Sequence, residues 1–260
     1  MDVYDRAHRC LLSLPGEVTI RLVRKRIGFL IPSANPTVEQ EMYQLAPEGV
    51  SVHFQRMVAR GPVGTLANLQ ARAASHLERM DETVEMIACV KPDVIVLAHT
   101  ATSYFLGREG EAKLARKVER DTGIPFISAL GAAVAACGAL GIRKAAMGTA
   151  YDKALTLKGK EVFESYGVEL VSAVWLPDVK SIFDEPPERV FGLARDADRP
   201  RAQAVFLSGV GLHTLSVLGP AEAELGKPVI SSASAMMWRA LRIAGVADAV
   251  PGYGRLLTQP

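Results

Sequence analysis

Short apolar runs rich in β-branched residues alternate with longer stretches of helical periodicity along most of the chain. This alternation is typical of β-α-β units and predicts an α/β fold with mainly parallel sheets flanked by helices. Strands are expected at Ile27–Ile31, Val50–Gln55, Val94–Ala98, Pro125–Ile127, Ala145–Gly148, Glu169–Val174, Ala204–Ser208 and Val229–Ile230. Helices are expected at Thr37–Leu45, Leu69–Cys89, Arg108–Thr122, Gly131–Leu140, Asp152–Tyr166, Pro187–Asp196 and Ala233–Ile243. These eight strands are more than one minimal doubly wound sheet requires.

Three stretches of the first half recur in the same order in the second half. The pairs are Gly123–Gly141 with Gly226–Gly245, Val94–Thr100 with Ala204–Val210, and, more faintly, Arg26–Pro32 with Lys144–Ala150. Ordered matches of this kind favour a duplicated unit, although β-α-β units in general look alike. We therefore expect an N-terminal extension over residues 1–26, a first lobe over 27–140 plus 236–260, and a second lobe over 141–235.

Composition narrows the class of partner. The 260 residues carry a formal net charge of only +2, so no global field favours nucleic acid or an anionic membrane, and a small molecule is the expected partner. No apolar run approaches the roughly 20 residues that span a bilayer, and the N-terminus lacks a secretory pattern, which predicts a cytoplasmic location. Cys10, Cys89 and Cys137 are far apart, so neither a disulfide framework nor a metal site is indicated.

Ligands of open parallel sheets bind at the carboxyl ends of the strands, where helix N-termini direct unpaired N–H groups outward. The segments at these positions are Pro32–Thr37, His99–Ser103, Thr149–Tyr151, Gly209–Gly211 and Ser231–Ser232. They are small, hydroxylic or amide-bearing, and none contains an acid. Such a lining suits a bound carboxylate, while each Ser or Thr could equally be a helix N-cap.

Few titratable side chains fall at these positions. His99 is the one that titrates near neutral pH, as either a proton-transfer group or a structural donor. Tyr151 could donate to an oxyanion or could simply lie at the edge of the core. His213 is expected in the first turn of a helix and is a weaker candidate, whereas His8 and His76 are predicted to be surface residues.

These segments resemble the aspartate/glutamate racemase superfamily, in the branch of maleate cis-trans isomerase and arylmalonate decarboxylase. The likeness runs from about Ile27 to Leu257 and lies in Ile31–Glu39, His99–Ser103, Ala150–Tyr151, Leu207–Thr214, Pro228–Ser232 and Pro251–Leu256. The resemblance implies two pseudo-symmetric flavodoxin-like lobes with the active site in the cleft between them. It also implies that no metal or organic cofactor is needed, and that a homo-oligomer is possible.

The chain departs from this family at both catalytic thiols. By the resemblance, one cysteine should follow a strand in each lobe, but these positions hold His99 and Gly209. Two-base racemisation needs groups on opposite faces of the substrate, and covalent isomerisation needs a thiolate. Neither activity should therefore be assumed, while the anion-binding half of the chemistry remains.

The sequence thus predicts a cofactor-free, decarboxylase-like lyase or isomerase that forms an enolate-type intermediate from a small carboxylate. His99 is the predicted general acid/base, with Thr100 and Tyr151 as further catalytic donors. The predicted substrate-binding residues are Pro32, Ser33, Asn35, Ala101, Gly209, Val210, His213 and Ser232. Two alternatives stay open, a maleate-type isomerase with a replaced nucleophile and a non-catalytic carboxylate-binding homologue. Candidate apolar wall residues, which could also be plain core, are Val58, Leu66, Met236 and Met237.

Overall fold

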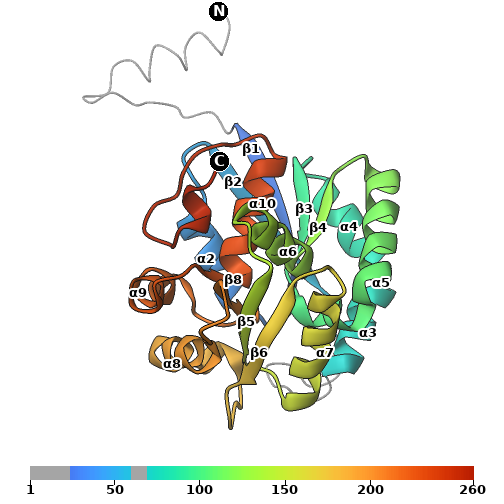
Figure 1. The fold of residues 1–260 in the computed structure, drawn as a ribbon. Coiled ribbons are helices and arrows are strands. Elements are labelled where there is room, and N and C mark those ends of the chain that lie inside the picture. Colours follow the sequence, from blue (N-terminus) through green and yellow to red (C-terminus); the bar gives the residue numbers. More distant parts are fainter. Residues whose placement is uncertain (1–23, 60–68) are drawn as a thin grey trace, which may run out of the picture.

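A computed structural model describes residues 24–59 and 69–260, which form two four-stranded parallel sheets (Figure 1). The first sheet has the order β2-β1-β3-β4, with β1 Lys25–Pro32, β2 Val50–Met57, β3 Val94–Leu97 and β4 Phe126–Ser128. The second has the order β6-β5-β7-β8, with β5 Lys144–Thr149, β6 Glu169–Trp175, β7 Ala204–Ser208 and β8 Val229–Ser231. All eight predicted strands are present, and the predicted α/β fold class is confirmed.

The two sheets repeat one topology. The first and fifth strands, β1 and β5, each occupy the second place in their sheet, and each is flanked by the strand that follows it in the chain. The three sequence matches pair β1 with β5, β3 with β7 and β4 with β8, which are equivalent places in the two sheets. The internal matches therefore reflect the repetition of a whole unit, as the sequence predicted.

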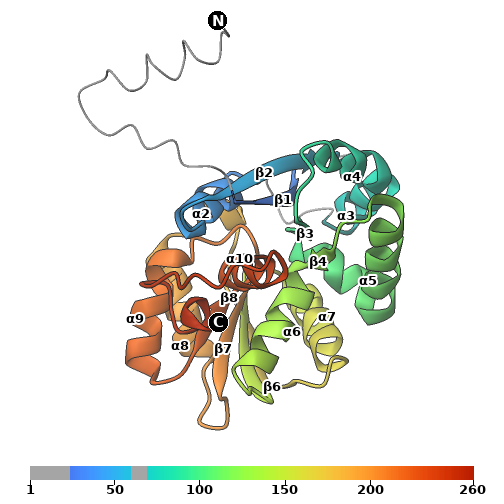
Figure 2. The same ribbon diagram turned by 90° about the horizontal axis from the view of Figure 1, so that it is seen from above.

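The helices run between the strands and cover the sheets (Figure 2). They are α2 Thr37–Leu45, α3 Leu69–Glu78, α4 Met80–Ala88, α5 Thr100–Thr122, α6 Ala129–Ala139, α7 Lys153–Glu164, α8 Pro187–Ala197, α9 Leu215–Leu225 and α10 Ser232–Ile243, with 3-10 turns η1 Ile182–Asp184 and η2 Leu256–Thr258.

Three helix predictions need correction. The helix expected over Leu69–Cys89 is broken at Arg79, whose φ of −113° and ψ of 20° are not helical, so α3 and α4 take different directions. The long helix α5 begins eight residues before Arg108, because Gly107 (φ 65°) kinks it and the preceding hydroxyl-rich stretch forms its first turns. The sequence also missed α9, which contains Pro220 yet continues to Leu225.

Two apolar clusters hold the sheets in place. The larger one is continuous through both sheets and includes Phe29, Val96, Phe163 and Phe206. The smaller one lies where α4 and α5 pack on the first sheet, and it contains Leu97, Val84 and Ile87 among others. Helix α10 follows β8 yet packs mainly on α6, so the C-terminal helix joins the two repeats.

The boundary of the N-terminal extension falls slightly earlier than expected. Lys25 and Arg26 pair with Val50 and Ser51 and are already part of β1, while residues 1–23 lie outside the described residues. The division into lobes at residues 140/141 and 235/236 stays a prediction. Within the described ranges, no helix is both long and apolar enough to cross a membrane.

Candidate active site

A cavity of about 60 Å³ lies between the two sheets, against the segments that directly follow β1, β3, β5 and β7. Helix α3 and the turn η1 form its remaining described walls. Its described lining consists of Pro32, Ser33, Ala34, Asn35, Ala59, Leu69, Arg72, His76, His99, Tyr151, Ile182, Phe183, Val210 and Gly211. None of these is an acid, so the cavity combines neutral donors with cationic or potentially cationic groups.

Six predicted site residues line this cavity, namely Pro32, Ser33, Asn35, His99, Tyr151 and Val210. Four others lie outside its lining and are wholly or nearly buried, namely Thr100, Ala101, Gly209 and Ser232. The structure therefore brings together predicted residues from the strand ends of both repeats. The first six form part of the lining of the cavity, and we call the other four the supporting layer.

The supporting layer is a hydrogen-bonded chain that crosses between the repeats. The hydroxyls of Thr100 and Ser232 are 3.2 Å apart, and the Gly209 amide donates to the Ser232 hydroxyl over 3.2 Å. The amide of Gly209, predicted as a ligand donor, is thus engaged within the protein.

His99 occupies the N-cap position of α5 and is 8% exposed. Its Nδ1 shares a hydrogen bond of 2.7 Å with the Thr102 hydroxyl, and its Nε2 makes no hydrogen bond to any described residue. Burial, reinforced by His76 and Arg72, lowers the pKa of His99 to about 3. The imidazole is therefore neutral at neutral pH.

Sequence reasoning missed two residues of α3. His76 was predicted at the surface but is 2% exposed, and its ring packs edge-on against His99 with centroids 5.1 Å apart. Arg72 is 7% exposed and lines the same cavity. Leu69, Arg72 and His76 are spaced i, i+3 and i+7, so they share one face of the helix. This spacing was the signal available in the sequence; His8 lies outside the described residues.

The side-chain amide of Asn35 is engaged in hydrogen bonds within the protein and is not free to bind a ligand. Its Oδ1 accepts from the amides of Thr37 (2.9 Å) and Val38 (3.0 Å), and its Nδ2 donates to the Val210 carbonyl over 3.3 Å. The Thr37 hydroxyl donates to the Gly211 carbonyl over 3.1 Å. The start of α2 in the first repeat is thereby tied to the loop after β7 in the second.

Two glycines in the turn after β7 lie close to η1, and one of them has a backbone conformation that favours glycine. Gly209 has a φ of +133°, and a Cβ there would lie 2.9 Å from Ile182 Cδ1. A Cβ on Gly211 would lie 2.6 Å from the Phe183 ring. The turn η1 therefore covers this loop closely, at the position where the family resemblance places a second cysteine.

The remaining candidates lie elsewhere. His213 precedes α9 instead of lying in its first turn, hydrogen bonds to the Phe183 carbonyl and borders a different surface cavity. Met236 and Met237 are buried in the core, and Val58 is 42% exposed. These residues do not line the cavity. Leu66 lies outside the described residues.

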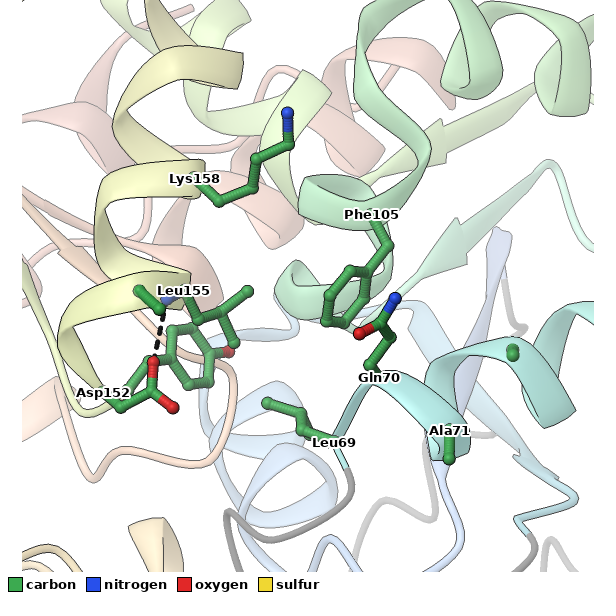
Figure 3. Close-up of a pocket in the computed structure, with 10 residues that line it drawn as sticks. Leu69, Gln70, Ala71, Phe105, Asp152, Leu155 and Lys158 are labelled. Carbon is green, nitrogen blue, oxygen red and sulfur yellow. Dashed lines mark hydrogen bonds between the residues drawn. The ribbon is translucent and has the colours of Figure 1, made fainter.

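A wider groove of about 660 Å³ adjoins the cavity and shares Leu69 and Tyr151 with it. Figure 3 shows Phe105 and Gln70 on one side of this groove, facing Leu155 on α7 and Asp152, the N-cap residue of that helix. The groove offers space for a larger substituent beside the small cavity.

Comparison with known proteins gives a consistent set of relatives. The family model "Arylmalonate decarboxylase" matches residues 27–257. A maleate isomerase of Nocardia farcinica is 30% identical over 244 residues, covering 90% of this chain and 96% of its own. An arylmalonate decarboxylase of Bordetella bronchiseptica is 33% identical over 177 residues, covering 64% of this chain and 71% of its own.

One solved relative is informative about the missing thiols. A Cys-to-Ser variant of the Nocardia farcinica maleate cis-trans isomerase, with a covalently bound succinylcysteine intermediate, superposes with a TM-score of 0.82 at 29% identity over 91% of this chain and 99% of that chain. In the part of this chain that the structure describes, Cys89 is exposed and Cys137 is buried, and neither lines the cavity. Burial raises the pKa of Cys137 to about 12, which keeps it a thiol.

Proposed function

Because the chain belongs to the arylmalonate decarboxylase family, we propose that it is a cofactor-independent lyase or isomerase acting on a small carboxylate or dicarboxylate. The proposed intermediate is of the enolate type, and decarboxylation is the favoured reaction. The observation that carries this proposal is the cavity between the two sheets, which places Arg72, Tyr151 and His99 around one space without an acidic side chain in its described lining.

In the proposed reaction the carbon–carbon bond to one carboxylate breaks and carbon dioxide leaves. The electron pair of the broken bond stays on the substrate and is delocalised into its remaining carboxylate. Tyr151 supports the developing oxyanion because burial raises the pKa of its hydroxyl, which therefore stays a proton donor. Arg72 contributes a positive charge from α3. Each well-placed donor to such an oxyanion typically contributes about 3 kcal/mol to lowering the barrier.

The carbon must then receive a proton, and His99 is the proposed carrier. Thr102 holds Nδ1, which leaves Nε2 as the nitrogen available to a ligand. A neutral imidazole is a poor acid, so His99 has to gain a proton before it can deliver one. An anionic ligand in the cavity favours that gain.

The experiment is incubation of the protein with phenylmalonate or maleate in deuterium oxide, followed by proton NMR. A deuterated decarboxylated product supports the decarboxylase, and fumarate supports the isomerase. Substitution of His99 by Gln should lower the rate by about 10²–10⁴-fold without loss of the fold, as expected for a proton-transfer group. His53 on β2 hydrogen bonds to Ser51 away from the cavity, so His53→Gln is the matched control.

A specific observation favours keeping a second candidate. Glycine stands at position 209, where a φ of +133° and the nearby Ile182 disfavour a side chain, and His99 stands at the other thiol position. A non-catalytic carboxylate-binding homologue would show thermal stabilisation by these acids without turnover. A cytoplasmic location, homo-oligomer formation and independence from cofactors remain predictions from the sequence.

A further inference from the structure

His76 is buried against the cavity with no hydrogen-bond partner for either ring nitrogen among the described residues. Buried polar groups in folded proteins are nearly always paired, because an unpaired group has lost its water without compensation. An apolar side chain would fill the same space at lower cost. The position of His76 is therefore explained better by a ligand than by packing.

The neighbouring charges show which ligand fits. Arg72 lies one helical turn before His76 and lines the same cavity, and His99 packs edge-on against His76 at 5.1 Å. The other titratable group of the described lining is Tyr151, whose hydroxyl is neutral because burial raises its pKa. Helix α3 thus contributes two potential cations to a space whose described walls hold no carboxylate.

On this basis, and resting on the proposed function, we propose that Arg72 and His76 form a subsite for a second anionic group of the substrate, and that His76 takes up a proton as that group binds. Short dicarboxylates are already among the substrates of the proposed function, and α3 would supply the groups that hold their second acid. One acid group would lie against α3, and the other would lie toward Tyr151 on the opposite side of the cavity.

Electrostatics supports this coupling. Burial, and then the charge of Arg72, lowers the pKa of His76 to about 4, so the free protein holds it neutral at pH 7. A carboxylate within hydrogen-bonding distance favours the imidazolium form and raises this pKa. Binding and protonation therefore favour each other, and binding should be accompanied by proton uptake.

The test uses the full chain labelled with ¹³C and ¹⁵N at histidine, with maleate as the probe. Imidazole resonances of the free protein are followed against pH, and those of His76 and His99 are assigned with H76Q and H99Q. We expect the His76 midpoint to rise from about 4 to at least 6.5 at saturating maleate, while the His53 midpoint stays unchanged. Calorimetry at pH 6.5, in two buffers of different ionisation heat, should show proton uptake, and H76Q should lower it by the part that belongs to His76.

The variants sharpen the result. H76Q and R72Q should each weaken maleate binding at least tenfold at pH 6.5, whereas H53Q should not. A ligand-induced change at His99 without one at His76, together with wild-type affinity of H76Q, would overturn the second subsite and leave the proposed function intact. If maleate and malonate changed neither histidine, both the subsite and the carboxylate cavity would be refuted. The titration itself is done on the wild-type protein. Folded variants are needed only to assign the His76 and His99 resonances.

Discussion

The chemistry of the cavity depends on how single residues are buried. His99 stands at the tip of β3 with one ring nitrogen bound by Thr102 and the other unpaired by any described residue. In a neutral imidazole the partner of one nitrogen selects which nitrogen carries the proton. The Thr102 hydroxyl can donate or accept, so its orientation is coupled to whether Nε2 presents a proton or a lone pair to the ligand.

Replacement of Thr102 by Val tests this coupling. The change leaves His99 Nδ1 without its partner in a buried site, so we expect the unfolding free energy to fall by about 1–3 kcal/mol. The ¹⁵N shifts of His99 should change from one dominant tautomer to a mixture. Thr102→Ser keeps the hydroxyl and is the control. Identical tautomer populations in Val and wild-type proteins would contradict the assignment.

At the scale of elements, helix contacts that cross the molecule depend on small residues. Gly159 on α7 faces the ring of Tyr104 on α5, and a Cβ there would lie 2.5 Å from Tyr104 Cζ. Gly192 on α8 has no atom within 4 Å of its own Cβ position. The same substitution should therefore have opposite signs at these two helical glycines.

We expect Gly159→Ala to lower the unfolding free energy by about 1–3 kcal/mol, because the fully buried Tyr104 has to shift. Gly192→Ala should raise it by about 0.5–1 kcal/mol, since alanine loses less backbone freedom in a helix. Urea denaturation of both variants measures the difference. Equal effects of the two substitutions would show that the contact of α5 with α7 tolerates a methyl group.

Glu41 makes the contact between α2 and α9 sensitive to pH. Its Oε1 accepts from the amides of Thr214 (2.6 Å) and Leu215 (3.1 Å), but burial outweighs these bonds and raises its pKa from 4.5 to about 7. Between these two values the folded chain keeps a proton that the unfolded chain has lost. Stability therefore falls as pH rises from about 4.5 to 7, by roughly 3 kcal/mol from this group.

Glu41→Gln should remove that fall. Glutamine keeps an oxygen that accepts from Thr214 and Leu215 but cannot ionise. The variant should match the wild-type protein near pH 4.5 and exceed its unfolding free energy by roughly 3 kcal/mol above pH 7. Denaturant unfolding at a series of pH values tests this. Parallel curves would mean that Glu41 ionises as easily in the fold as in the unfolded chain.

The elements themselves were largely predictable, because apolar runs and helical periodicity are local properties. Every strand was found, and α2 begins and ends as predicted. The errors fall where the local signal is weak, because neither α9, which contains Pro220, nor the hydroxyl-rich start of α5 was predicted as helix. Helix α3 was found, but its polar face was taken as solvent-exposed when it faces the cavity.

At the scale of the whole molecule, duplication was visible in the sequence, and with it the meeting of strand ends from both repeats. Which pairs of residues join the repeats was not visible. Asn35 with Val210, and Glu41 with Thr214, are separated by more than 170 positions and follow no period. Such contacts depend on how the sheets are placed relative to each other, which no local pattern encodes.

Tyr104 and Ser208 provide a fully buried link of this kind that can be tested directly. The Tyr104 hydroxyl on α5 lies 2.5 Å from the Ser208 hydroxyl at the end of β7, and both side chains are fully buried. We expect Tyr104→Phe and Ser208→Ala each to cost about 1–3 kcal/mol of unfolding free energy, because each leaves a buried hydroxyl without its main partner. The double variant should cost less than the sum, since it removes both polar groups together. A coupling of at least about 0.5 kcal/mol is expected from denaturant unfolding.

Ser172, whose hydroxyl donates to the Ala197 carbonyl instead, is the control, and Ser172→Ala should be additive with Tyr104→Phe. Additivity of Tyr104→Phe with Ser208→Ala would show that the repeats are held together by apolar packing alone at this point.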